Sequence, residues 1–372
     1  MPTIVKKKRH RAQFHPLTVS DVQRLTDTAV AVSFTVPDEL ADEFAFEPGQ
    51  HLTLRAEIEG EDVRRSYSIC LPRSEALSHK QLRVATARVN GGLMSNWLGE
   101  KVQVGDEIQV MTPLGGFTCP TQPQRARHHV AIAAGSGITP VMSLLTTALE
   151  EEPNSQATLI FGNRRTDSIM FLEELEGLKN RYPGRFHLIH VLSREVQDVE
   201  LFTGRIDRQK LDRLFRSLVP VDQVDEWYLC GPFGMVETAR ELLAERGVAS
   251  AHVHHEVFHV DELGATVQPS PVETEPGAPP EAVVTVDLDG RTTVIEMPSK
   301  AETILAATLR ERPDAPFSCT GGVCGTCRAR VVEGEVRMDR NYALEPDEVA
   351  AGIVLACQSH PVTDTVKLDY DA

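Results

Sequence analysis

The chain has 372 residues, of which 41% are hydrophobic and 25% are charged, as in ordinary globular proteins. At roughly 100–200 residues per domain, this length predicts two or three domains with well-buried cores. The net charge of −16 argues against a general nucleic-acid-binding protein, which needs a basic face for phosphate contacts, but it permits docking to a basic patch on a partner.

The first residues, Met1 to Pro16, carry the basic run Lys6–Arg9 without the apolar stretch that follows such a run in a secretory signal. We interpret the run as a basic terminus in preference to a docking arm. Elsewhere no apolar run approaches the roughly 18 residues of a membrane span. We therefore expect a cytoplasmic protein that does not bind a membrane.

Residues 14–120 predict a small antiparallel β-barrel. Short segments rich in β-branched or alternating apolar residues are separated by turn material such as Glu59-Gly60 and Pro72-Arg73-Ser74. The expected strands are Val30–Val36, His51–Ile58, Leu82–Val89 and Glu107–Met111.

Residues 125–260 alternate short apolar strands with amphipathic helices. This alternation indicates βαβ units and therefore an α/β domain with a parallel sheet. The expected strands are His129–Ala134, Thr158–Phe161, Phe186–Leu192 and Glu226–Leu229. The expected helices are Pro140–Leu149, Phe171–Arg181, Asp207–Leu218 and Met235–Arg246.

Residues 261–281 predict an extended, mobile linker, because they hold five acidic residues, five prolines and no Lys or Arg. Residues 282–372 predict a compact third unit. Its strands Val283–Val286 and Thr292–Met297 flank Asp289-Gly290, a good hairpin signal. A helix near Thr303–Arg310 then precedes a cysteine-rich loop.

The cysteine loop carries the strongest functional signal. Cys319-x4-Cys324-x2-Cys327, followed by Cys357, matches the spacing of plant-type [2Fe–2S] ligands, with three thiolates from one loop and the fourth from a neighbouring strand. Glycines in the loop allow backbone N–H groups to turn toward the sulfurs. The alternative is a structural zinc site, which usually shows two Cys-x2-Cys pairs where this chain has one.

Two motifs in the first domain suit a flavin. Arg65-Ser66-Tyr67-Ser68 ends a barrel strand and offers a guanidinium for a phosphate, hydroxyl donors and a ring to lie against an isoalloxazine. Asn90–Ser95 places Gly91-Gly92 at the start of a short helix, whose N–H groups suit a pyrophosphate. Each motif alone is weak, because a strand or a plain N-cap carries such residues by chance.

Three motifs in the second domain suit a nicotinamide dinucleotide. Gly135-Ser136-Gly137-Ile138-Thr139-Pro140 resembles the dinucleotide fingerprint, with Pro140 in place of the third glycine. Cys230-Gly231-Pro232 ends a strand, where parallel sheets bind ligands. Ser193-Arg194 favours NADPH over NADH, because a hydroxyl and a guanidinium suit a 2′-phosphate, and Arg164-Arg165 is a second candidate pair.

In this order the motifs resemble the ferredoxin–NADP reductase superfamily with a C-terminal ferredoxin module, over about residues 14–372. The runs Arg64–Cys70, Leu229–Val236 and Met338–Pro346 resemble, more narrowly, the reductase subunits of phenylacetyl-CoA epoxidases. The resemblance implies a flavin-binding β-barrel, a nicotinamide-binding α/β domain and a β-grasp (α+β) ferredoxin domain. Related reductases with the same domain order serve steroid hydroxylases and other oxygenases.

The resemblance also implies the site. Tyr67 and Cys230 would lie at the reacting rings of FAD and NADPH. The implied cofactor-binding residues are Arg65, Ser66, Tyr67, Ser68, Gly92, Met94, Ser95, Gly135, Gly137, Thr139, Ser193, Arg194, Gly231 and Pro232. The implied cluster ligands are Cys319, Cys324, Cys327 and Cys357. Cys70 and Cys119 are interpreted as small hydrophobic residues, and Phe258 as a core aromatic in preference to a flavin cover.

The implied activity is an NADPH-dependent oxidoreductase that passes single electrons to an oxygenase complex, with the di-iron phenylacetyl-CoA epoxidase favoured. One alternative is the reductase of another oxygenase, a Rieske dioxygenase or a steroid hydroxylase. The other is a non-enzymatic subunit with a metal-stabilised C-terminal module.

Overall fold

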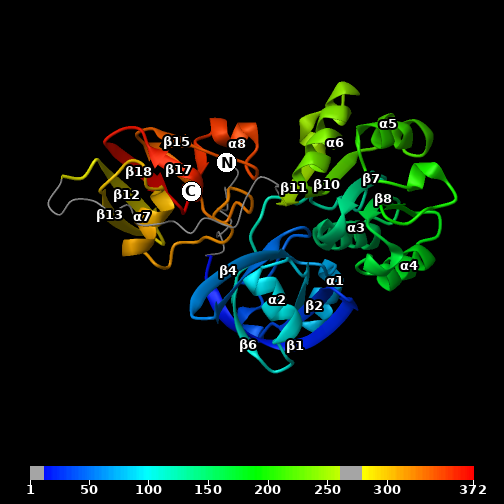
Figure 1. The fold of residues 1–372 in the computed structure, drawn as a ribbon, viewed down its shortest axis with the longest axis horizontal. Helices are drawn as coiled ribbons and strands as arrows, with labels where there is room; N and C mark the ends of the chain where they lie inside the picture. Colours follow the sequence, from blue (N-terminus) through cyan, green and yellow to red (C-terminus); the bar gives the residue numbers. More distant parts are fainter. Residues whose placement is uncertain (1–11, 260–278) are drawn as a thin grey trace, which may run out of the picture.

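The computed structural model describes residues 12–259 and 279–372, which form three lobes, each built on its own sheet (Figure 1). The fold is multi-domain, with a curled antiparallel sheet, a parallel sheet and a mixed sheet in chain order. The basic run near the N-terminus and most of the predicted linker at 261–281 lie outside the described residues.

The first sheet is a curled, antiparallel, six-stranded barrel with the strand order β4-β3-β6-β1-β2-β5. An antiparallel bridge between Ile69 and Val84 joins the ends of this order and closes the barrel. Helix α2 (Leu93–Glu100) contributes Met94 and Leu98 to the barrel core. The strands are β1 (Phe14–Thr26), β2 (Ala29–Thr35), β3 (His51–Ile58), β4 (Glu61–Ser68), β5 (Gln81–Ala87) and β6 (Glu107–Met111).

Two features of the barrel differ from the prediction. Pro72-Arg73-Ser74 is not a turn: Pro72 is the N-cap of helix α1 (Arg73–His79), and a proline suits this place because the start of a helix needs no N–H from it. Strand β1 was not predicted. Only Leu17 and Val19 among its 13 residues are buried, which is too few to make an alternating apolar pattern.

The second sheet is fully parallel, with the order β11-β10-β7-β8-β9. Its strands are β7 (His128–Ala134), β8 (Gln156–Asn163), β9 (Phe186–Leu192), β10 (Glu226–Pro232) and β11 (Val253–His259). Its helices are α3 (Ile138–Glu151), α4 (Leu172–Arg181), α5 (Arg208–Ser217) and α6 (Phe233–Glu245).

The two faces of this sheet follow the alternation of side chains along β7. Ala131 and Ala133 share a core with α3 and α4, whereas Val130 and Ile132 share a second core with α5 and α6. The chain winds outward in both directions from β7, which makes the gap between β7 and β10 the switch point where such sheets bind ligands. Strand β11 was not predicted, because Val253–His259 mixes polar and apolar residues.

The barrel and the parallel sheet pack against each other. Ala29, Ala31 and Ala85 of the barrel belong to the same buried cluster as α3. At the edge of this contact Arg73 lies 3.2 Å from Glu151. The shared core fixes the position of the barrel relative to the carboxyl ends of the parallel strands.

The third sheet is mixed, with the order β13-β12-β18-β14-β16 and a parallel β12–β18 pair, the arrangement of a β-grasp domain. The predicted hairpin is confirmed: Asp289 (φ 56°) and Gly290 (φ 66°) both adopt the left-handed conformation of a tight turn. The elements are β12 (Ala282–Leu288), β13 (Arg291–Met297), α7 (Ile304–Glu311), β14 (Arg328–Glu333), β15 (Val336–Met338), α8 (Pro346–Ala350), β16 (Ile353–Leu355), β17 (Ser359–Pro361) and β18 (Thr365–Asp369).

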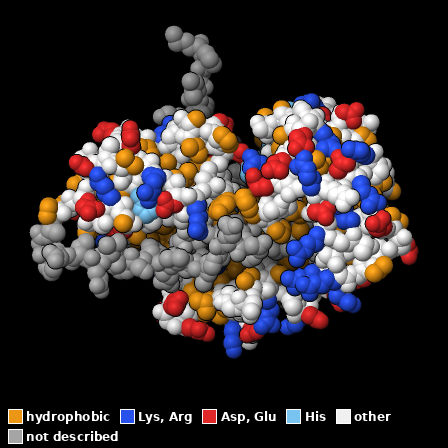
Figure 2. Space-filling model, turned by 45° about the horizontal axis from the view of Figure 1, so that its top comes forward, with side chains coloured by type: hydrophobic (Ala, Val, Ile, Leu, Met, Phe, Trp, Pro, Cys, Tyr) orange, Lys and Arg blue, Asp and Glu red, His pale blue; other side chains and the backbone are white. Residues whose placement is uncertain are grey.

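The described surface carries both signs of charge. In Figure 2, Lys and Arg side chains stand beside Asp and Glu side chains over much of the drawn face. Arg208 with Glu245 and Lys300 with Asp364 are examples of such pairs. Among the described helices, none combines the length and the apolar character that crossing a membrane requires.

Candidate functional site

Four cysteines meet at one end of the third lobe. Cys319, Cys324 and Cys327 lie in the loop between α7 and β14, where the thiols of Cys319 and Cys324 are hydrogen-bonded. Cys357 is hydrogen-bonded to Cys327. It lies in a single 3-10 turn, Ala356–Gln358, and not in the strand that we predicted. The Ser359 N–H closes this turn by donating to the Ala356 carbonyl, and the Ala356 N–H donates to the Cys327 carbonyl at 3.0 Å, which ties the turn to the cysteine loop.

The backbone of the loop suits thiolate ligands. The N–H groups of Val323 and Cys324 point at the Cys319 sulfur, at 3.4 and 3.3 Å. Gly322 has a φ of 79°, and a Cβ atom there would lie 3.0 Å from the Arg340 carbonyl oxygen, so this position requires glycine. Four free thiols with N–H groups aimed at sulfur fit an iron–sulfur cluster.

The Arg65–Ser68 motif occupies the end of β4, as predicted. Arg65 donates to the Arg64 carbonyl at 2.7 Å, and the Ser66 hydroxyl lies 3.2 Å from that of Thr53 on β3. The Tyr67 ring packs against the barrel core, and burial raises the pKa of its hydroxyl, which therefore stays protonated. A guanidinium, hydroxyls and an aromatic ring on one strand end fit a flavin and its phosphate.

Helix α2 begins directly after Gly91-Gly92, as predicted, and no side chain caps it. Ser95 accepts a hydrogen bond from the Val89 N–H at 3.1 Å, and the Met94 side chain is buried in the barrel core. The Ser95 hydroxyl is the acceptor in that bond and keeps its O–H as a donor for a phosphate, beside the backbone N–H groups of Met94 and Ser95. The uncapped first turn fits a pyrophosphate through those groups.

The Gly135–Pro140 motif lies at the switch point of the parallel sheet. Gly135 to Gly137 form a short 3-10 turn that runs into α3, and Thr139 donates to the Ser136 carbonyl at 3.0 Å. A Cβ atom on Gly137 would lie 2.2 Å from the Cys230 carbonyl oxygen. The absence of a side chain therefore lets the loop after β7 approach the Cys230-Gly231-Pro232 end of β10.

Cys230 itself is fully buried. Burial strongly raises the pKa of its thiol, and the nearby Glu256 acts in the same direction. Cys230 is therefore a neutral thiol at the switch point, where it can line a binding site but does not act as a thiolate nucleophile.

The two candidate pairs for a 2′-phosphate are adjacent in space. The Arg194 N–H donates to the Arg164 carbonyl at 2.8 Å, which joins the ends of β8 and β9. Both side chains are exposed, and within the described residues neither is seen in an ion pair, whereas Arg165 lies 3.2 Å from Asp167. At about 4.8 Å per strand, Arg164 lies one strand (about 5 Å) and Arg194 two strands (about 10 Å) along the sheet from β7, which the Gly135–Gly137 turn follows.

Glu256, which the sequence did not single out, joins the flavin strand to the nicotinamide strand. It lies on β11 opposite Cys230, and its carboxyl accepts a hydrogen bond from the Ser68 hydroxyl at 3.2 Å. Burial raises the pKa of Glu256 to about 8, and the neighbouring Cys324 acts in the same direction, although the Ser68 hydrogen bond opposes this. No sequence signal pointed to Glu256, because the strand that carries it was itself not predicted.

His51 brings the third lobe to the same place. Its ring lies 4.0 Å from the Glu256 carboxyl on one side and 3.4 Å from the Thr326 hydroxyl of the cysteine loop on the other. Burial lowers the pKa of His51 to about 4, so the ring is neutral at physiological pH. Residues of all three lobes, Ser68, Glu256 and Thr326, therefore meet around one histidine; we call this set with His51 the junction.

Glu256 predicts a pH-dependent stability. Its carboxyl keeps a proton up to about pH 8 in the folded protein but only to about pH 4.5 when unfolded, so it makes stability fall as pH rises between these values. We expect Glu256→Gln to be more stable than the parent protein, with a higher melting temperature. The margin, a difference in free energy of unfolding, should grow from pH 5 to pH 8, by at most about 1.4 kcal/mol per pH unit. Thermal unfolding of both proteins at several pH values measures the margin, and a margin that is independent of pH would contradict this account.

Contacts beyond the junction hold the third lobe in place. The Arg64 guanidinium lies over the Phe317 ring, 4.2 Å from its centre. The Met338–Pro346 run contacts the parallel-sheet lobe: Tyr342 packs edge-on against Phe233 at 5.1 Å, and Glu345 lies 3.0 Å from His255. This run therefore docks the cysteine loop beside β11.

The remaining sequence expectations concern Phe258, Cys70 and Cys119. Phe258 packs against the buried cluster that contains Cys230 and Tyr228, in agreement with a core role. Cys70 is buried in the same cluster and is the small core residue that we expected. Cys119 packs against the edge of the same cluster, as expected, and also contacts the Arg127 guanidinium.

Comparison with known protein families assigns each lobe. Residues 16–119 match an oxidoreductase FAD-binding domain, residues 131–241 an oxidoreductase NAD-binding domain and residues 286–362 a 2Fe-2S iron-sulfur cluster binding domain. The chain thus has domains for FAD, a nicotinamide dinucleotide and a [2Fe–2S] cluster. These matches overturn the zinc alternative and the non-enzymatic alternative.

Whole-chain relatives share this domain order. One component of the 1,2-phenylacetyl-CoA epoxidase of Escherichia coli is 42% identical, over 96% of this chain and 98% of that protein. The ferredoxin reductase component of the 3-ketosteroid-9-alpha-monooxygenase of Rhodococcus rhodochrous is 35% identical, over 95% and 96%. The solved structure of a phthalate dioxygenase reductase has the same fold, with a TM-score of 0.56, 23% identity and coverage of 96% and 98%.

Proposed function

The chain belongs to the family of oxygenase reductases that join FAD-, NAD- and [2Fe–2S]-binding domains, and we propose that it passes electrons from NADPH through FAD to the cluster and on to an oxygenase. When bound, the flavin accepts an electron pair as hydride and releases single electrons, which the cluster carries one at a time. The protein supplies binding, orientation and protection from water.

The junction is the observation that carries this proposal. Ser68 belongs to the flavin strand, Glu256 lies opposite Cys230 on the nicotinamide side, and Thr326 belongs to the cysteine loop. A nicotinamide, a flavin and a cluster held by these neighbours would lie close together. Short distances between them are what direct electron transfer from donor to acceptor requires.

We assign the roles as follows. Arg65, Ser66, Tyr67 and Ser68 hold the flavin ring and its phosphate. Gly92, Met94 and Ser95 bind the pyrophosphate through their backbone N–H groups and the Ser95 hydroxyl. Gly135, Gly137, Thr139, Gly231 and Pro232 shape the nicotinamide dinucleotide site, with Cys230 near its ring. Cys319, Cys324, Cys327 and Cys357 ligate the cluster. Glu256 orients Ser68 and holds a proton beside Cys230.

We propose domains at 14–120, 125–260 and 282–372, with the acidic linker at 261–281 giving the ferredoxin domain its reach to flavin and partner. A cytoplasmic location is supported by the seven cysteines, all of which are free thiols.

The basic edge at Arg164 and Arg194 supports NADPH as the donor. We expect Arg194→Ala to raise the KM for NADPH about tenfold or more while leaving the KM for NADH unchanged, because a charge-assisted hydrogen bond to the 2′-phosphate contributes about 1.5–3 kcal/mol. Steady-state kinetics with both donors measure this, with Arg216→Ala on α5 as the control. An equal change for both donors would show that Arg194 does not select the 2′-phosphate.

The oxygenase partner is proposed from the relatives. Because the Escherichia coli epoxidase component is 42% identical against 35% for the steroid monooxygenase component, we favour a di-iron phenylacetyl-CoA epoxidase over a steroid hydroxylase or a Rieske dioxygenase. Mixing the reductase with each oxygenase and its substrate, and measuring product formed per NADPH oxidised, tests this choice. Efficient coupling to a different oxygenase would reassign the partner without changing the reductase chemistry.

The reductase proposal itself is tested by anaerobic titration of the purified protein with NADPH and then NADH, followed by visible absorption. Bleaching of a flavin band and of an iron–sulfur shoulder by sub-stoichiometric NADPH is the expected result. A colourless protein, or one that neither donor reduces, would overturn it.

A further inference from the structure

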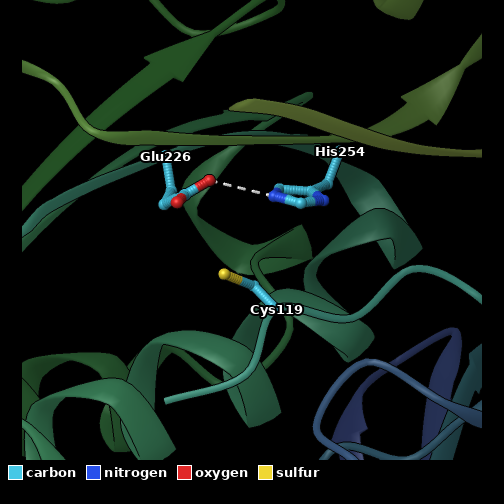
Figure 3. Close-up of side chains that lie close together, drawn as sticks. All are labelled: Cys119, Glu226 and His254. Carbon is cyan, nitrogen blue, oxygen red and sulfur yellow. Dashed lines mark hydrogen bonds and ion pairs between the residues drawn. The ribbon is translucent and has the colours of Figure 1, made fainter. Parts of the chain in front are cut away.

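A second cluster of reactive side chains lies at the other end of β10. Cys119 belongs to the segment that crosses from the barrel to the parallel sheet, Glu226 begins β10, and His254 lies on β11. Figure 3 shows the Cys119 sulfur pointing toward the Glu226–His254 pair, and the reactive atoms of the three side chains all lie within 4.8 Å of one another. The His254 Nε2 atom is 3.0 Å from a Glu226 oxygen.

Arg127 adds a fixed positive charge. Its Nη1 atom lies 3.5 Å from the Cys119 sulfur and 3.5 Å from a Glu226 oxygen. The guanidinium is buried and cannot turn away, because it is also bonded to Glu152 and to the Pro120 carbonyl, the latter at 3.0 Å. The Tyr228 hydroxyl is a further hydrogen-bond partner of Cys119.

We propose that Cys119 is a reactive thiolate that hydrogen peroxide and soft electrophiles modify, with Arg127, His254 and Tyr228 stabilising the anion. The residue as a whole is half-buried and is not enclosed like Cys70 and Cys230. Cations and hydrogen-bond donors around an accessible sulfur are the environment in which cysteines react.

The ionisation states agree with this arrangement. Although burial opposes both shifts, hydrogen bonds from His254 and Tyr228 lower the pKa of Cys119, and bonds to Cys119 and Glu226 raise the pKa of His254 to about 9. His254 is therefore an imidazolium at neutral pH. Other titratable groups close by are Glu152 and His129, which contact each other at 3.0 Å, and His252, which lies 3.5 Å from Glu226.

The reaction with peroxide balances without a further reagent. The Cys119 thiolate attacks one oxygen of hydrogen peroxide, an S–O bond forms and the O–O bond breaks. Sulfur loses two electrons to the departing oxygen, which leaves as hydroxide and takes a proton from the His254 imidazolium. The products are a sulfenic acid, water and a neutral imidazole.

A metal ion fits this cluster less well. Cys119, Glu226 and His254 offer sulfur, oxygen and nitrogen ligands, but the Arg127 guanidinium, held by Glu152, already occupies the space between the sulfur and the carboxylate. A divalent cation would be repelled by this fixed charge.

This site is separate from the proposed electron-transfer junction. Glu226 is the first residue of β10, and Cys230 lies four residues further along the strand, about 13 Å away at about 3.3 Å per residue. A group attached to Cys119 therefore does not block the proposed nicotinamide site near Cys230. The reactivity of Cys119 can be tested independently of the reductase activity.

The test is labelling of the native holoprotein with iodoacetamide from pH 5 to 9, with modified peptides measured by mass spectrometry. We expect Cys119 to react with a midpoint below that of free cysteine in the same tube. The buried Cys70 and Cys230 serve as internal controls and should stay unlabelled. Hydrogen peroxide followed by a sulfenic-acid trap should mark Cys119 alone.

Two comparisons make the assignment specific. His254→Gln should slow labelling at pH 7 about threefold for each unit by which the thiol pKa rises, because the loss of thiolate is partly offset by the higher nucleophilicity of the thiolate that remains. His187→Gln, an exposed position on β9, should have no effect. A wild-type midpoint equal to that of free cysteine, or protection of Cys119 by one equivalent of Zn²⁺, would overturn the proposal whether or not the variants fold.

Discussion

Replacing Cys324 with alanine is expected to reduce electron delivery to an oxygenase, or to a one-electron acceptor protein, to the background rate. NADPH-dependent reduction of a two-electron dye should continue at the parent rate. The reason is that Cys324 lies at the centre of the cysteine loop, hydrogen-bonded to Cys319, whereas the proposed flavin and nicotinamide residues lie in the other two lobes. A cluster with three ligands in place of four is lost or altered.

The measurement pairs two assays on one preparation: dye reduction, and delivery to the acceptor. Iron content and the visible spectrum report on the cluster. Cys70→Ala, a buried cysteine of the barrel–sheet core, is the matched control and should keep its cluster. Parallel loss of dye reduction in Cys324→Ala, with circular dichroism unchanged, would mean that the cluster is not the last carrier before the partner.

Sequence patterns predicted those parts of the site that are local in the chain. Three cluster ligands lie within nine residues, and the Arg65–Ser68 and Gly135–Pro140 motifs each span a single strand end, so spacing alone identified them. The strand predicted at Cys357 was wrong: Cys357 lies in a single turn between the short strands β16 and β17, and cysteine spacing does not show where a strand is interrupted.

The junction could not be predicted from the sequence, because it depends on contacts between residues that are far apart in the chain. Ser68 and Glu256 are 188 residues apart, and His51 and Thr326 are 275 apart, so only the packing of three lobes brings them together. The charged neighbours of Cys119 could not be foreseen either. Arg127, Glu226 and His254 come from residues just before β7, from β10 and from β11, and not from the sequence around Cys119.

Replacing Gly137 with alanine is expected to lower the rate of flavin reduction by NADPH about 100-fold, because a misplacement of about 1 Å at a reacting centre has an effect of that order. The new Cβ would lie 2.2 Å from the Cys230 carbonyl oxygen and 3.0 Å from the Gly231 nitrogen, both backbone atoms that cannot rotate away. Backbone strain plays no part, since Gly137 has a φ of −60° and a ψ of −7°, which alanine adopts freely.

Gly234→Ala supplies the matched control. Gly234 lies three residues after Gly231, near the start of α6, and an added Cβ meets nothing within 4 Å. Rapid mixing with NADPH should show a slow Gly137→Ala variant and an unchanged Gly234→Ala variant, while dithionite reduces the flavin in both. If NADPH reduced the Gly137→Ala protein at the parent rate, hydride transfer would not depend on the close approach of β7 and β10. The proposed position of the nicotinamide near Cys230 would then be wrong.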